Sequence, residues 1–240
     1  MTVLFTLALV VVLVLGASAL LLHFFKLAQK RPLLISRLSY INIQSAYQLW
    51  LLSFSLMTLA VLALFYPDVL SQYLSAGNLA APARGVALFG IAEGESWWTL
   101  GWTLSLGITF LTALFMRLQF RPSLADLRRV LPLLPVIVLF SSTNALSEEI
   151  LYRLAVIVPL AQQMDPTWLL LLSAVLFGTP HLRGMPSGLV GALMAGVLGW
   201  LLAKSMLESG GFFWAWWIHF LQDIVIFSVL MSNALKTERS

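Results

Sequence analysis

Residues 147–153 read SEEILYR and lie between two apolar runs, LPLLPVIVLF at 131–140 and LAVIVPLAQ at 154–162. The stretch places two adjacent carboxylates and an arginine in surroundings that are typical of a membrane helix. Charged groups inside a bilayer are costly, and they usually face the interior of a protein, where they serve a function. The stretch therefore predicts a membrane protein with a polar site inside it.

The composition of the whole chain supports this class. Hydrophobic residues make up 60% of the 240 positions and charged residues only 10%, whereas a soluble domain has about 25% charged residues. Cysteine is absent, which excludes disulfides, thiolate metal sites and a cysteine nucleophile. The net charge of +4 comes from short loops and forms no basic face, so we expect no nucleic-acid partner.

Apolar segments of membrane length recur along the chain. A bilayer core of about 30 Å requires about 20 apolar residues per helix. Segments that meet this requirement lie at 2–25, 45–65, 97–116, 187–205 and 211–232, and shorter apolar stretches lie at 130–145, 149–163 and 167–180. We therefore predict an all-α, polytopic membrane bundle of about eight transmembrane helices. Its single integral membrane domain comprises N-terminal spans at 1–129, a helical core at 130–232 and a short tail at 233–240.

The loop charges predict part of the topology. Eight of the 14 basic residues fall in the first and third loops, namely Lys26, Lys30, Arg31, Arg37, Arg117, Arg121, Arg128 and Arg129. The positive-inside rule places these loops in the cytoplasm and the N-terminus outside. Beyond residue 130 the rule does not decide, because Lys204 and the pair Lys236 and Arg239 flank the last span on opposite sides. We expect a multi-pass protein of the bacterial cytoplasmic membrane.

Two further patterns indicate helix packing and membrane interfaces. One helix face combines small residues at Gly191, Ala192, Ala195, Gly196 and Gly199, a pattern that lets another helix approach closely. Tryptophans gather near span ends, at Trp97, Trp98, Trp102, Trp214, Trp216 and Trp217. Such groups are typical of an interfacial aromatic belt.

Three polar groups interrupt the apolar core. In a helix, Glu149 and Arg153 are spaced i, i+4 and can form an ion pair, while Glu148 projects about 100° away from Glu149. The second group is FGTPH, in which a proline at 180 should end or kink the helix beside His181. In the third group, His219 and Asp223 share one helical face.

One shared interior site explains these groups more simply than separate structural accidents. Of the ten acidic residues, only Glu148, Glu149 and Asp223 lie in apolar context, and two of the three histidines join them. Glutamate and histidine without cysteine suggest either a general base that acts on water or a metal site. A desolvated carboxylate is a stronger base near neutral pH, and a histidine can donate to a developing oxyanion. No serine with a neighbouring base stands out, although Ser141, Ser142 and Ser147 are close in sequence.

At these residues the chain resembles the CPBP family of intramembrane proteases, which includes CAAX prenyl endopeptidases and bacterial proteins linked to bacteriocin self-immunity. The family pattern is EExxxR, FxxxH and then HxxxN or HxxxD. The three motifs occur here in that order at Glu148–Arg153, Phe177–His181 and His219–Asp223. The resemblance covers about residues 130–232, and the first three spans match the family only in hydropathy.

The resemblance implies a fold of about eight helices, a cleavage reaction and a role for each matched residue. Glu148 would be the general base that activates water, with help from His181. His219 and Asp223 would line the oxyanion hole. Supporting residues would be Glu149, Arg153 and Phe177. The implied activity is hydrolysis of a peptide bond in a membrane-associated protein substrate, within the lipid bilayer and without a cofactor.

Asp223 departs from the HxxxN form of the last motif. Asparagine can donate a hydrogen bond to an oxyanion, whereas an ionised aspartate cannot. Either Asp223 is protonated, or it orients His219 and holds it as the donor. We favour the second explanation.

Three alternatives to this mechanism remain open from the sequence. Zinc could be held by Glu148, His181, His219 and Asp223, although a helical HExxH pair is absent from the sequence. A non-catalytic bacteriocin-immunity or membrane interaction protein is a second alternative. A transporter is the third, since buried ionisable residues also mark transport pathways. Inverted repeats would favour it, and the sequence shows no obvious repeat.

Overall fold

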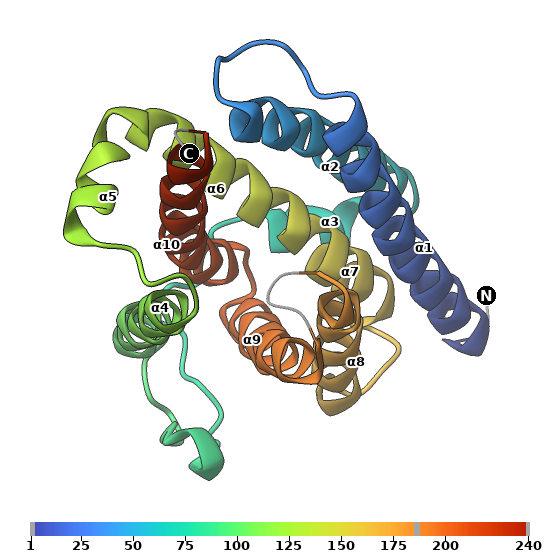
Figure 1. Ribbon diagram of the computed structural model, residues 1–240. Coiled ribbons are helices and arrows are strands. Elements are labelled where there is room, and N and C mark those ends of the chain that lie inside the picture. The colour runs from blue at the N-terminus through green and yellow to red at the C-terminus, as the bar shows by residue number, and fades with distance from the viewer. Residues whose placement is uncertain (1–2, 185–187, 239–240) are drawn as a thin grey trace.

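The computed structural model describes residues 3–184 and 188–238 and shows an all-helical bundle (Figure 1). The first residues of the predicted spans at 2–25 and 187–205, and the last two residues of the predicted tail, lie outside the described residues. The long helices are α1 (Val3–Lys30), α2 (Ser39–Phe65), α4 (Trp97–Phe120), α6 (Leu134–Glu149), α9 (Gly188–Ser209) and α10 (Phe213–Thr237). The shorter ones are α3 (Pro67–Leu74), α5 (Leu124–Arg129), α7 (Ala155–Leu160) and α8 (Pro166–Gly178). Short 3₁₀ turns lie at Ala87–Phe89, Leu131–Leu133 and Thr179–Leu182.

The prediction of a polytopic helical bundle is confirmed, but the helices divide the apolar segments differently from the predicted spans. Within the described ranges, six helical stretches are long and apolar enough to cross a membrane. The apolar stretches predicted at 130–145 and 149–163 form one of them, Leu131–Leu160, and the stretch predicted at 167–180 belongs to the shorter apolar helix Pro166–Leu182. The charged motif does not break the helix, because its glutamate and arginine pair with each other inside it.

The merged span contains a π-helical turn, η3 (Ile150–Leu154), directly after the two glutamates. A π turn inserts an extra residue into the helix, and such turns are frequent at functional sites. All five residues of the turn are buried. Figure 1 shows α6 lying between α2 and α10, and both helices contact it. Side chains from three helices can therefore meet near the end of α6.

The small-residue face of α9 packs against α8, as predicted. A Cβ atom on Gly178 of α8 would lie 2.6 Å from the carbonyl oxygen of Ala192, and one on Gly199 would lie 3.0 Å from the Cβ of Phe177. The two backbones can approach this closely because neither glycine carries a side chain. This packing holds Phe177 against the interior of the bundle.

The prediction of an interfacial tryptophan belt is wrong for two of the six tryptophans. Trp97 and Trp214 are fully buried. The indole N–H of Trp97 donates to Glu208, and that of Trp214 donates to the carbonyl oxygen of Leu79. These rings pack inside the protein because they fill space between α4, α9 and α10 and find internal acceptors for their N–H groups.

Trp214 also gives a packing test within α4. A Cβ atom on Gly101 would lie 2.4 Å from the Trp214 ring, whereas one on Gly107 would meet nothing within 4 Å. We expect Gly101→Ala to destabilise the protein by about 2 kcal/mol through overpacking, and Gly107→Ala to stabilise it by up to about 1 kcal/mol. Thermal unfolding in detergent measures both. Equal effects of the two substitutions would contradict the close contact.

One end of the bundle joins the loop before α4 to the turn between α9 and α10. The backbone N–H of Asn78 donates to Ser209, and that of Phe212 donates to Ser75. At the same end, buried Lys204 pairs with Glu208 and donates to the carbonyl oxygen of Arg84. Lys204 is therefore neutralised inside the protein and carries no information about topology.

The other end of the bundle brings the C-terminus to the basic loops. Lys236 near the end of α10 lies 2.6 Å from Asp126 of α5, and Glu238 accepts hydrogen bonds from Ser39 at the start of α2. The end of α10 thus lies on the same side as the loops at 31–38 and 121–123. The positive-inside rule predicts that this side faces the cytoplasm.

The contact between Lys236 and Asp126 predicts a pH dependence of stability. Hydrogen bonds from Lys236 and then Ser123 lower the pKa of Asp126 below its ordinary value of 3.8. A depressed carboxyl pKa stabilises the folded state above the unfolded pKa and loses that effect as the pH falls toward the folded pKa. We expect Asp126→Asn to be less stable than wild type at pH 7, with a gap that narrows below pH 3.8. A constant gap in melting curves from pH 7 to about pH 2 would contradict this.

Candidate active site

The two adjacent glutamates have different surroundings. Glu149 is fully buried and its Oε1 lies 3.1 Å from Nη1 of Arg153, so the predicted ion pair is confirmed. The guanidinium also lies 4.0 Å from the centroid of the Phe177 ring, an additional cation–π attraction. The side chain of Glu148 is 18% exposed. Glu149 is therefore a fixed, neutralised group, and Glu148 is the carboxylate that remains accessible.

His219 of α10 lies between the carboxylates. Its Nδ1 donates to Oε1 of Glu149 at 2.7 Å. Its Nε2 lies 3.7 Å from Oε2 of Glu148 and 3.8 Å from Oδ2 of Asp223. The latter two distances are too long for direct hydrogen bonds. Glu149 makes the hydrogen bond to Nδ1 because the packing of α6 on α10 brings it there. Asp223 lies within ion-pair distance of Nε2, so its proposed role in orienting His219 stays a prediction.

Asp223 is held by a residue that the sequence reasoning missed. Its Oδ2 accepts a hydrogen bond of 3.0 Å from Nδ2 of Asn144. Asn144 stands four residues before Glu148, on the same helix, and residues at that spacing are neighbours on one helical face. A polar residue one turn before the first glutamate was the signal that could have identified it.

His181 lies in the 3₁₀ turn Thr179–Leu182 that follows α8, and the hydrogen bond and ring contact that it makes are with Phe177 rather than with Glu148 or His219. Its Nδ1 donates to the carbonyl oxygen of Phe177 at 2.9 Å. The Phe177 ring contacts both histidine rings, with centroids 5.2 Å from His181 and 5.7 Å from His219. The described contacts of His181 with the site thus run through Phe177. Its Nδ1 hydrogen bond leaves Nε2 as an acceptor in the neutral ring.

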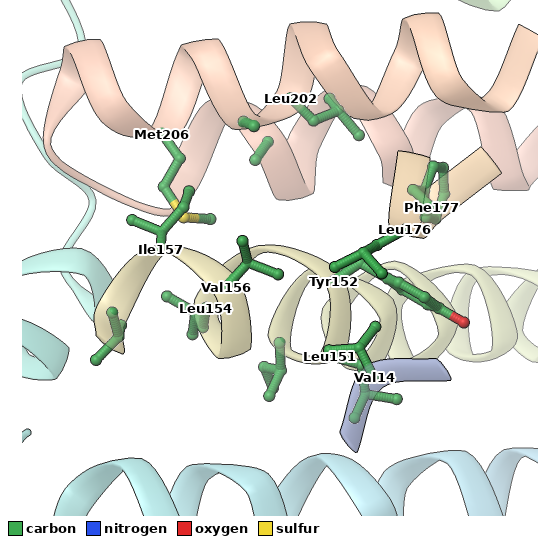
Figure 2. Close-up of a cluster of buried hydrophobic side chains, with 14 of the residues drawn as sticks. Val14, Leu151, Tyr152, Leu154, Val156, Ile157, Leu176, Phe177, Leu202 and Met206 are labelled. Atoms are coloured by element: carbon green, nitrogen blue, oxygen red, sulfur yellow. The ribbon is translucent and has the colours of Figure 1, made fainter. Parts of the chain in front are cut away.

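Apolar side chains close the site on one side. Figure 2 shows Tyr152 and Phe177 within a cluster of buried side chains from α7, α8 and α9. Their rings meet edge to face at 5.2 Å, and the Tyr152 hydroxyl shares a 2.9 Å hydrogen bond with Ser18 of α1. The helices that carry the motifs are thereby packed around an apolar wall.

The sequence offered Glu148, His181, His219 and Asp223 as possible zinc ligands. Among the described residues, which include all four candidates, no group of three or more His, Asp or Glu side chains is arranged to hold a metal ion. A zinc site needs three or four donors at about 2.0–2.2 Å from one point.

One comparison with known proteins gives a match. Residues 130–225 match the family model described as type II CAAX prenyl endopeptidase Rce1-like. This range includes all seven predicted site residues, from Glu148 to Asp223. No curated protein and no solved structure gives a significant match. The resemblance seen in the three motifs is thus confirmed: residues 130–225 of this multi-pass membrane protein are similar to the Rce1-like type II CAAX prenyl endopeptidase family.

Proposed function

We propose that the protein is a glutamate-dependent intramembrane endopeptidase, in which Glu148 activates the water that cleaves a peptide bond of a membrane-associated protein. The observation that carries this proposal is the arrangement around His219. Glu149 is buried and bound, whereas Glu148 is partly exposed and lies 3.7 Å from Nε2 of His219. That separation exceeds a direct hydrogen bond but allows one water to contact both groups.

The geometry supports a sequence of proton transfers. Glu148 takes a proton from the water while the water oxygen attacks the carbonyl carbon of the substrate peptide bond. The carbonyl oxygen then becomes an oxyanion. With His219 as the imidazolium, Nε2 donates to that oxyanion, while Nδ1 donates to Glu149 and so fixes the ring. The tetrahedral intermediate then collapses, the C–N bond breaks, and Glu148 returns its proton to the leaving amine.

In this proposal His181 helps to orient the attacking water. Because its Nδ1 donates to the Phe177 carbonyl, Nε2 can accept a hydrogen bond from the attacking water. It would orient the water from the α8 side, with Glu148 acting from α6. The substrate would be a peptide segment at or within the bilayer, and the protein would act in a bacterial cytoplasmic membrane.

The test begins with substrate discovery. Purified wild-type protein in detergent is added to solubilised membrane proteins, and new N-termini are labelled and identified with and without a chelator. We expect cleavage that survives the chelator and disappears in Glu148→Ala at unchanged folding. Cleavage that needs added zinc would replace the proposed chemistry with a metal-dependent one. Absence of any Glu148-dependent cleavage would contradict an enzymatic function.

Asp223 provides a separate prediction. We expect Asp223→Asn to retain activity within about tenfold of wild type, because the amide oxygen can still accept from Asn144. Asp223→Ala removes that contact and should lose about 100-fold, a typical effect for a group beside an oxyanion. Both are measured as kcat/KM on one substrate from the screen. Lower activity in the asparagine variant than in the alanine variant would contradict this role.

A further inference from the structure

Three consecutive hydrogen bonds join Thr143 of α6, Gln48 of α2, Asn144 of α6 and Asp223 of α10. The hydroxyl of Thr143 shares its one hydrogen between the carbonyl oxygen of Leu139 at 2.8 Å and Oε1 of Gln48 at 3.1 Å. Nε2 of Gln48 donates to Oδ1 of Asn144 at 3.1 Å, and Nδ2 of Asn144 donates to Oδ2 of Asp223 at 3.0 Å. Gln48 lies outside the range 130–225 that matches the family model.

These three hydrogen bonds have a direction that their donors and acceptors impose. The NH₂ group of Asn144 faces Oδ2 of Asp223, the orientation that an ionised carboxylate requires because it can only accept. The amide oxygen of Asn144 then accepts from the NH₂ group of Gln48, and the amide oxygen of Gln48 accepts from Thr143. Asp223 therefore receives a donor at Oδ2, which is also the oxygen nearest to Nε2 of His219.

All three side chains beyond Thr143 are removed from solvent. Gln48, Asn144 and Asp223 are 6%, 8% and 5% exposed. A buried polar group without a partner is costly, so a reversed amide that presents oxygen to the Asp223 carboxylate would be strongly disfavoured. The relay, defined as Thr143, Gln48, Asn144 and Asp223, can therefore hold one orientation of each amide and one position of the carboxylate.

We propose that Gln48 and Asn144 are positioning residues, which hold Asp223 as a hydrogen-bond acceptor beside His219. The proposal rests on the proposed function, since it concerns the same site. It assigns a role in the site to α2, one of the N-terminal spans. Neither amide needs to touch the substrate, because both act through the Asp223 carboxylate.

The first arm of the test breaks the relay at its far end. Gln48→Met keeps the side-chain length and removes both hydrogen bonds, without altering Asn144 or Asp223. Misplacement of a group beside the reacting atoms is expected to lower kcat about tenfold, with KM within about twofold of wild type. The matched control is Gln44→Met, one turn earlier on α2 and 7% exposed, which should change kcat by less than about twofold.

The second arm separates positioning from general helix packing. A carboxylate can only accept, so it requires the one orientation of Asn144 that Gln48 stabilises. The amide introduced by Asp223→Asn can accept or donate, so it tolerates either orientation. Gln48→Met should therefore cost about tenfold in kcat in the wild type but less than about threefold in an Asp223→Asn background. The same coupling should appear in the melting temperatures of the four proteins.

Each outcome decides the proposal. A Gln48→Met effect that is equal in both backgrounds, in kcat and in melting temperature, would show simple packing and overturn the relay. A loss of kcat in Gln44→Met as large as in Gln48→Met would also overturn it. If Glu148→Ala abolishes cleavage, the proposed function stands whatever the relay variants do. If no Glu148-dependent cleavage exists, the proposed function fails, and coupled melting temperatures would still support the relay as the contact that holds Asp223.

Discussion

Glu148→Gln is expected to lower kcat/KM about 1,000-fold, since general-base catalysis contributes about 10²–10⁴-fold. The amide keeps the size and shape of the carboxyl group but cannot take the proton of the attacking water. Because the Glu148 side chain is 18% exposed and 3.7 Å from Nε2 of His219, its loss leaves no buried charge unpaired. We therefore expect a melting temperature within about 2 °C of wild type, as for a substitution away from the core.

The substitution Glu149→Gln at the adjacent glutamate is the control for this prediction. Glu149→Gln removes a buried charge that pairs with Arg153 and His219, so it should lower the melting temperature as well as the activity. Steady-state kinetics and thermal unfolding of the two variants distinguish their roles. If Glu148→Gln keeps more activity than Glu149→Gln, the assignment of the base to Glu148 is wrong.

Arg153→Met is expected to give the largest loss of stability, about 3–5 kcal/mol, because it leaves the Glu149 carboxylate buried without its cation. Both side chains have no exposed surface. For a chain of this length the loss corresponds to a fall of roughly 6–20 °C in melting temperature. The methionine retains contact with the Phe177 ring, so the effect reports mainly the missing charge.

A second substitution tests that explanation. When Glu149→Gln is combined with Arg153→Met, both charges of this ion pair are removed together, and the introduced amide oxygen can still accept from Nδ1 of His219. We expect the double variant to recover part of the lost melting temperature. A double variant that is less stable than Arg153→Met alone would show that the arginine acts through packing and not through its charge. Tryptophan fluorescence or circular dichroism in detergent measures the unfolding.

Several features could be predicted from the sequence because they depend on neighbours along one helix. The ion pair between Glu149 and Arg153 follows from their spacing of four residues, and it is present. The close approach of another helix to α9 follows from small residues that recur on one helical face, and the structure identifies that helix as α8. The apolar segments predicted an all-helical membrane bundle, because spans must satisfy their backbone hydrogen bonds internally.

Other features depend on the three-dimensional packing of distant segments. The hydrogen bond between His219 and Glu149 joins residues 70 positions apart, and the relay from Gln48 to Asn144 spans 96 positions. Spacing along one helix does not reveal such partners, so the contact of Glu149 with His219 was not predicted. Likewise, the burial of Trp97 and Trp214 depends on how α4, α9 and α10 fit together.

The sequence by itself determined that this protein is a helical membrane bundle and which residues carry its polar motifs. Periodicity and apolar length are local properties, and they express the requirement of the bilayer for paired backbone groups and neutralised charges. Only the tertiary structure decided which glutamate is bound and which is accessible, and which side chains hold His219 and Asp223. Those differences arise where α2, α6 and α10 meet, because burial and hydrogen-bond partners are set by the packing of separate helices.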